Sequence, residues 1–132
     1  LQFPAGKALD ALSAQAEKVK PFPVKVENCT FSLSGMENKV KQMMEKGEAP
    51  ETVARFALET VARAVVKATR QALEHFPGLP VLCSGGVASN SLLRQVMERE
   101  CGAIFAQPRF STDNAMGTAI LTWRALEQER TQ

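Results

Sequence analysis

The stretch CSGGVASNSLLRQ (residues 83–95) decides how the second half of this chain folds. It follows a short apolar run, 79–83, and leads into a helix-like segment, so Gly85 and Gly86 stand where a strand turns into a helix. Glycines there adopt backbone angles closed to other residues and let a ligand approach the main chain. The N–H groups of such a turn and of the next helix attract a phosphate or a carboxylate. The glycines therefore indicate either a phosphate-binding turn or a plain structural turn.

The polar residues after the glycines allow the same two interpretations. Ser89 or Asn90 is placed to cap the next helix, or Asn90 turns its amide toward a ligand. Ligands of open α/β sheets bind beyond the carboxyl ends of the strands, which is where these residues are expected.

Outward from this stretch, the second half alternates strands and helices. The expected elements are a buried strand at 81–83, a helix at 90–100, a short strand at 103–106 and a last helix at 115–127. Trp123 and Leu126 are the expected anchors of the last helix. This order predicts an α/β fold with parallel strands.

The first half reads as mostly helical. The expected elements are helices at 8–19, 36–46 and 50–75, and a strand at 24–32 that runs into a turn at Ser34-Gly35. Helix 50–75 carries an apolar stripe formed by Val53, Ala57, Val61, Ala64, Val65, Ala68, Ala72 and Leu73. Another of its faces repeats charges every four residues. This charged face includes Arg63, Lys67 and Arg70, which form either a nucleic-acid-binding patch or a solvated, salt-bridged face. The salt-bridged face is the favoured interpretation.

Length and composition set limits on the function. The chain has 132 residues and a formal net charge of +2, which fits one domain and does not by itself call for nucleic acid. Its three cysteines give neither a disulfide framework nor a CxxC metal pattern, so buried thiols in a reducing cytoplasm are expected. The single His75 is expected to be a surface residue at a helix end, which leaves no His pair and no Ser-His-Asp triad. No apolar run is long enough to span a bilayer.

Two further polar segments sit at element boundaries. Asp113, within Ser111–Asn114, follows a strand and precedes a helix, so it is either a ligand for a divalent cation or a helix N-cap. FSLSG (31–35) is a strand-to-helix turn with two hydroxyl groups.

Together these motifs resemble one family. FSLSG resembles its FSFSG turn, SGGVASNSLLR its GGVxxNxxLR segment, STDNAMGTAI its TDNxAMIA segment, and the opening FPAGKALDAL its YPGGPxLDKLA turn. The four occur in family order across the chain. The family is TsaD, the tRNA threonylcarbamoyladenosine synthases once called glycoproteases or O-sialoglycoprotein endopeptidases. The resemblance implies the ATPase fold shared by actin, sugar kinases and Hsp70, in which two ribonuclease H-like lobes clasp a nucleotide.

The resemblance also implies a function and its residues. TsaD-like proteins transfer a threonylcarbamoyl group from threonylcarbamoyl-adenylate to adenosine 37 of tRNA. This chain would be the carboxyl-terminal lobe of such a cytoplasmic transferase, a single lobe (1–132) within a longer chain and inactive alone. It would contribute half of a site for ATP or the adenylate, with tRNA and TsaB-like subunits as partners. The implied nucleotide-binding residues are Gly6, Asp10, Gly85, Gly86 and Asn90, and the implied ligand of a divalent metal is Asp113.

The chain departs from the family pattern at several points. Ala5 replaces the first glycine of the PGG turn, Glu37 stands where the family has lysine, and DNAMG shifts the methionine. The metal-binding HxxxH pair of the family is not in this sequence. The alternative to a catalytic lobe is therefore a TsaB-like paralogue that pairs with a catalytic subunit through helices. A peptidase is disfavoured, because no nucleophile here has a base.

Overall fold

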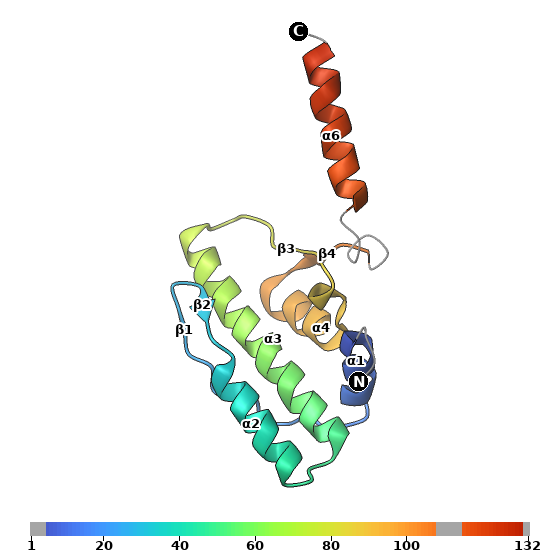
Figure 1. Cartoon of the computed structure of the whole chain (residues 1–132). Coiled ribbons are helices and arrows are strands. Elements are labelled where there is room, and N and C mark those ends of the chain that lie inside the picture. The colour runs from blue at the N-terminus through green and yellow to red at the C-terminus, as the bar shows by residue number, and fades with distance from the viewer. Residues whose placement is uncertain (1–4, 108–114, 131–132) are drawn as a thin grey trace.

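One long helix, α3 (Pro50–His75), runs through the middle of the molecule, and three other helices pack against it (Figure 1). The computed structural model describes residues 5–107 and 115–130. The three neighbouring helices are α1 (Ala5–Ser13), α2 (Ser34–Glu45) and α4 (Ser91–Cys101). The helix predicted at 50–75 is confirmed. Proline at its first position fits because that N–H has no partner in a helix.

The first two helices differ from expectation at their ends. Helix α1 begins three residues earlier than predicted and ends at Ser13, whose buried hydroxyl donates a hydrogen bond to the Asp10 carbonyl (2.8 Å). Helix α2 already includes the expected Ser34-Gly35 turn, and Ser32 Oγ accepts a hydrogen bond from the Ser34 N–H (3.3 Å). Gly47 ends α2 as predicted, with a φ of +72°.

The strand expected at 24–32 is a hairpin. Strands β1 (Val26–Glu27) and β2 (Thr30–Phe31) pair antiparallel, with Val26 opposite Phe31. The two residues between them, Asn28 and Cys29, both have positive φ (50° and 60°), which is the geometry of a type I′ turn. Cys29 is exposed, so the expectation of buried thiols was wrong for this residue.

The second half forms the predicted parallel pair. Strands β3 (Leu82–Cys83) and β4 (Ile104–Phe105) are adjacent and parallel, and α4 connects them after a short 3₁₀ helix, η1 (Val87–Ser89). The prediction that β3 is buried was wrong. The paired residues Leu82 and Ile104 are 73% and 59% exposed, because the described helices cover only the other face of this sheet.

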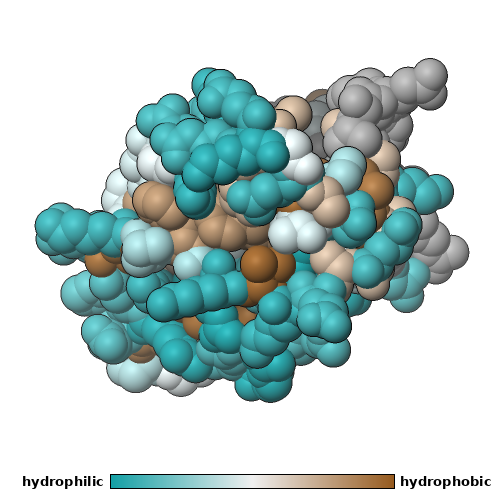
Figure 2. All heavy atoms as spheres, turned by 90° about the horizontal axis from the view of Figure 1, so that it is seen from below, coloured by the Kyte–Doolittle hydropathy of each residue, from teal (hydrophilic) through white to brown (hydrophobic). Residues whose placement is uncertain are grey.

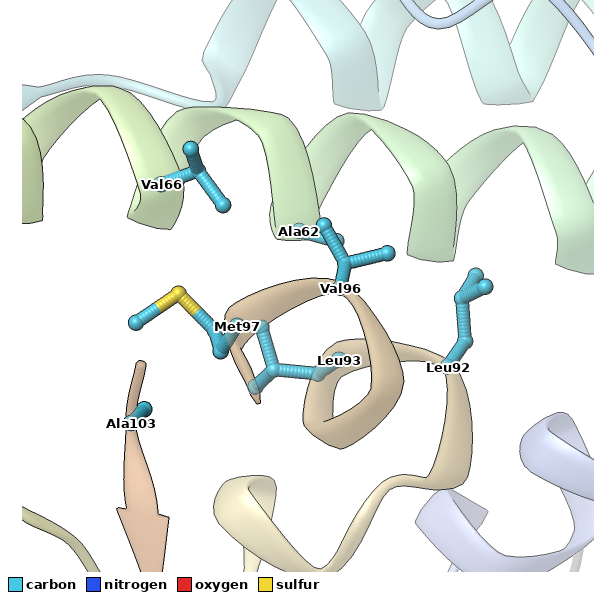
Figure 3. Close-up of a cluster of buried hydrophobic side chains, with 7 residues drawn as sticks. All are labelled: Ala62, Val66, Leu92, Leu93, Val96, Met97 and Ala103. Carbon is cyan, nitrogen blue, oxygen red and sulfur yellow. The ribbon is translucent and has the colours of Figure 1, made fainter. Parts of the chain in front are cut away.

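The main core lies between α3, α4 and this sheet (Figure 3). Its buried members are Ala62, Val66, Leu92, Leu93, Val96, Met97 and Ala103. A second cluster joins α2 to α3. Because α3 is covered on more than one side, its buried residues do not form a single stripe. Of the eight stripe residues predicted, only Val53 and Ala64 are buried, and the other six are partly exposed.

The charged face of α3 is tied into the fold. Arg55 and Glu59 form the expected pair four residues apart (2.8 Å), and Glu59 is almost fully buried. Lys67 Nζ donates to the Val24 carbonyl (3.2 Å). Arg63 and Arg70 both reach Glu100 of α4. Arg63 and Arg70 are thus salt-bridged within the chain, as the favoured interpretation expected, whereas Lys67 bonds a backbone carbonyl.

Glu100 should make the free energy of unfolding depend on pH in the acidic range. Hydrogen bonding from Arg99, aided by the charges of Arg63, Arg70 and Arg99, holds the Glu100 pKa below its ordinary value of 4.5. A carboxyl group whose pKa is lower in the folded than in the unfolded state stabilises the folded state at pH values above its ordinary pKa. This stabilisation is lost as the pH falls through the lower pKa of the folded state. We therefore expect Glu100→Gln to be less stable than wild type near neutral pH. Urea unfolding across that pH range should show the difference shrinking below pH 4.5; a constant difference would contradict this.

The last helix, α6 (Ala115–Arg130), stands apart from the other helices in Figure 1. Trp123 and Leu126 are 62% and 54% exposed. The prediction that they anchor this helix was therefore wrong within the described part of the chain. None of the helices in residues 5–107 and 115–130 combines the length and apolar character needed to cross a membrane.

Candidate nucleotide-binding site

The two glycines after β3 have different backbone requirements. Gly85 has a φ of +102°, which side-chain-bearing residues rarely adopt, so the turn needs glycine there. Gly86 has φ −61° and ψ −39°, ordinary helical angles open to any residue. The conformation of the turn therefore explains the first glycine and not the second.

Packing does not explain Gly86 either. A Cβ added at Gly86 would meet no atom of the described residues, its chain neighbours apart, within 4 Å, and the same holds at Gly85. The space beside this turn is open in the part of the chain that the structure describes. A glycine without a conformational or packing requirement is what close approach of a ligand to the main chain would call for.

Asn90 caps α4. Its Oδ1 accepts a hydrogen bond from the Leu93 N–H (2.9 Å), so Asn90 rather than Ser89 is the capping residue. Ser89 Oγ donates to the Gly85 carbonyl at 3.5 Å, across the turn. Because the cap uses the oxygen of the Asn90 amide, its two N–H donors point away from the helix backbone.

Asp10 joins α1 to the start of α4. Its Oδ1 accepts hydrogen bonds from Asn90 Nδ2 (2.9 Å) and Ser91 Oγ (2.8 Å), and its Oδ2 accepts one from the Ser91 N–H (3.0 Å). A carboxylate at a helix N-terminus also interacts favourably with the helix dipole. The structure therefore brings together Asp10 and Asn90, two predicted site residues that lie 80 positions apart. Sequence reasoning missed Ser91, whose one signal is its place at the first position of the helix.

The remaining predicted residues lie as follows. Gly6 is exposed on α1, four residues before Asp10 and so on the same face of that helix. Asp113, the predicted metal ligand, lies outside the described residues. Within residues 5–107 and 115–130 there is no group of three or more His, Cys, Asp or Glu side chains that could hold a metal. Of the predicted site residues, Asp113 is the one that would hold a metal.

Partial burial raises the pKa of the cysteine nearest the turn. Cys83 ends β3, directly before the turn, and desolvation raises the pKa of its thiol. A thiol with a raised pKa is a weak nucleophile, because the thiolate is the reactive form.

The single histidine, His75, lies exposed in the last turn of α3, as predicted. It lines a separate polar cavity of about 390 Å³ beside the β1–β2 hairpin.

An apolar groove of about 550 Å³ opens between α1, α2 and α3. Its apolar lining residues are Leu9, Leu12, Met36, Val40, Met44, Pro50, Val53, Ala54 and Ala57. Figure 2, which views the molecule from below, shows hydrophobic residues in a hollow with hydrophilic ones around it. Glu37 lies at this groove and pairs with Lys41 (2.8 Å), whose hydrogen bond and charge lower the Glu37 pKa. The charge reversal at Glu37 is therefore neutralised within α2.

Comparison with known proteins agrees with the motifs. Residues 1–120 match the family model described as TsaD, tRNA N6-adenosine threonylcarbamoyltransferase. Proteins of that name from Staphylococcus carnosus and Thermus thermophilus are 32% and 30% identical, over 87% and 94% of this chain. A probable bifunctional tRNA threonylcarbamoyladenosine biosynthesis protein from Methanosarcina mazei is 32% identical over 91% of the chain and 22% of its own length. The chain spans 38% and 40% of the two bacterial relatives. This chain belongs to the TsaD family.

Proposed function

We propose that this chain is the carboxyl-terminal lobe of a tRNA threonylcarbamoyltransferase and supplies half of its nucleotide site. The ligand would be ATP or threonylcarbamoyl-adenylate, and the acceptor adenosine 37 of tRNA. The observation that carries the proposal is Gly86, a glycine that neither its backbone angles nor its packing requires, at the carboxyl end of a parallel strand. Ligand crevices of α/β sheets lie at this end of the strands.

Each residue of the site has a role in this proposal. The main chain at Gly85 and Gly86 would approach the phosphate, with its N–H groups as donors. Asn90 would offer the ligand the one amide N–H that Asp10 does not use, and its cap fixes the direction of that amide. Asp10 is a positioning residue, since its carboxylate holds Asn90 and Ser91 in place. Gly6 would leave room along α1 for the sugar of the ligand.

Family membership implies the actin and Hsp70 type of ATPase fold, in which two lobes close on a nucleotide. The site described here would then be one wall, and the opposing lobe would supply the other. A divalent metal at Asp113 would polarise a carbonyl or phosphate oxygen. The chain's own residues would bind and orient the ligand on this wall, and Cys83, whose thiol pKa is raised by desolvation, would take no part.

Substituting Asp113→Ala in the intact protein tests the proposal. We expect tRNA threonylcarbamoylation to fall by at least about 100-fold, since loss of even an outer-shell partner of a metal costs about 10–100-fold. The thermal unfolding midpoint should stay unchanged. Asn114→Ala, next to it in the sequence, serves as the matched control for loss of a polar side chain. Full modification by Asp113→Ala would overturn the catalytic role.

A second candidate function is a partner subunit without catalysis of its own. The observation that favours it is the apolar groove between α1, α2 and α3, whose shape and lining suit a helix of another subunit. A scaffold of this kind has no need of Asp113 or of Gly86. Unchanged tRNA modification in the Asp113→Ala protein, with folding retained, would therefore support the partner reading.

A further inference from the structure

Three arginines converge on one carboxylate at the end of α4 that is far from the candidate site. Glu100 Oε1 accepts hydrogen bonds from Arg63 Nη1 (2.7 Å) and Arg99 Nη2 (2.8 Å), and its Oε2 accepts one from Arg70 Nη2 (3.1 Å). The Glu100 side chain is only 14% exposed, whereas those of Arg70 and Arg99 are 57% and 59% exposed. The carboxylate therefore lies beneath the guanidinium groups and holds them at the surface.

The cluster carries an excess of positive charge. Three guanidinium groups and one carboxylate leave a surplus of two, which equals the formal net charge of the whole chain, +2. The formal charges of all other residues therefore sum to about zero. The net positive charge of the whole chain corresponds to the charge of this cluster. Lys67, on the same charged face of α3, adds a further cation close to the hairpin.

The geometry suits a phosphate. A guanidinium group has five N–H donors in a planar fork, and each of these arginines uses a single nitrogen on Glu100. Arg70 also hydrogen-bonds the Cys101 side chain, and the donors that Arg70 and Arg99 have left would face the paired oxygens of a phosphate group. Arginines already held in place by Glu100 lose less side-chain entropy on binding than free ones do.

We propose that Arg63, Arg70 and Arg99 form a surface that binds the phosphate backbone of RNA. This rests on the proposed function, in which tRNA is the acceptor. The same helix, α4, carries the candidate nucleotide site at its first residue and Glu100 near its last, so the two lie roughly 14 Å apart along the axis at 1.5 Å per residue. Phosphate contacts fix the position of a nucleic acid. Contacts at one end of α4 would thus position the RNA while its target base reaches the other.

The test is binding of an unmodified tRNA transcript to the intact protein at several salt concentrations. The variant is Arg70→Ala with Arg99→Ala, which leaves the less exposed Arg63 in the fold. The slope of log K against log salt should become shallower by about two, because each phosphate contact contributes roughly 0.7–0.9 to it. The matched control is Lys18→Ala with Lys20→Ala, which removes the same charge from exposed positions elsewhere and should keep the slope.

Two further variants keep the proposal testable. If the double variant fails to fold, Arg99→Ala alone replaces it in the test. This single change should reduce the slope by about one. Glu100→Gln keeps all three guanidinium groups and should therefore keep the salt slope, while loss of the carboxylate that holds them in place should weaken tRNA binding. An unchanged slope in the double variant, or a loss no greater than in the lysine control, would overturn the proposal. So would weakened assembly with a protein subunit while tRNA binding stays intact, since that outcome assigns the surface to an acidic protein.

Binding of ATP, measured in parallel, separates this proposal from the one on which it rests. Normal ATP binding with an unchanged tRNA salt slope would reject the arginine surface alone. Absence of both ATP binding and tRNA modification in the wild-type protein would reject the proposed function itself.

Discussion

Met97→Ala should lower the free energy of unfolding by about 2–5 kcal/mol, the cost of truncating a large buried side chain and leaving a cavity. Met97 is 1% exposed and lies in the core that α3 and α4 share with the strand region at Ala103 (Figure 3). No neighbour can fill the space without moving one of these elements, because protein interiors are close-packed. Urea unfolding followed by circular dichroism measures the change.

Met44→Ala is the matched control for this prediction. Met44 is 65% exposed on α2, so the same chemical change there should alter stability by no more than about 0.5 kcal/mol. Equal losses for the two variants would mean that Met97 is not packed as described. Because α4 also presents Asn90 and Ser91 to Asp10, the core around Met97 supports the candidate site.

Gly86→Leu should weaken nucleotide binding without unfolding the protein. The helical angles of Gly86 accept any residue, and the space beside it is open, so stability should change by no more than about 0.5 kcal/mol. If a phosphate approaches the main chain there, the leucine side chain occupies its place. We expect the affinity of the intact protein for ATP to fall at least about tenfold, which corresponds to about 1.4 kcal/mol. Isothermal titration calorimetry measures it.

Gly85→Ala is the contrasting variant for this prediction. The φ of +102° at Gly85 makes alanine strained, so this change should lower stability by roughly 1–2 kcal/mol although it adds only a methyl group. Gly86→Leu should thus lower ATP affinity and leave stability nearly unchanged, whereas Gly85→Ala should lower stability. Unchanged ATP affinity in Gly86→Leu would show that the open space is not where the nucleotide lies.

The sequence predicts best where one local signal decides the structure. Pro50 and the long amphipathic pattern fix the start and length of α3, and Asn90 marks the start of α4. The hairpin at 26–31 was missed because its turn needs two consecutive residues with positive φ. Asn28 is a usual residue for that conformation, but Cys29 is not. Only the first of the two turn residues therefore indicates a type I′ turn. The exposure of Leu82 depends on what covers the sheet, which local sequence does not encode.

The candidate site shows the same division. Gly85 and Asn90 follow from the strand-to-helix turn, and the structure gives each a definite role. The contact of Asp10 with Ser91 joins residues 81 positions apart, and no periodicity or spacing in the chain indicates it. The family resemblance placed Asp10 in the site. Its three hydrogen bonds then define it as the link between α1 and α4.

The central claim is that a nucleotide binds at the turn between β3 and α4. Hydrogen–deuterium exchange of the intact protein, with and without ATP, tests it most directly. We predict slower amide exchange on ATP binding at residues 84–93, with a smaller effect around Asp10, because the ligand covers the turn and steadies its contact with α1. Protection confined to other parts of the protein, with residues 84–93 unchanged at saturating ATP, would contradict the account.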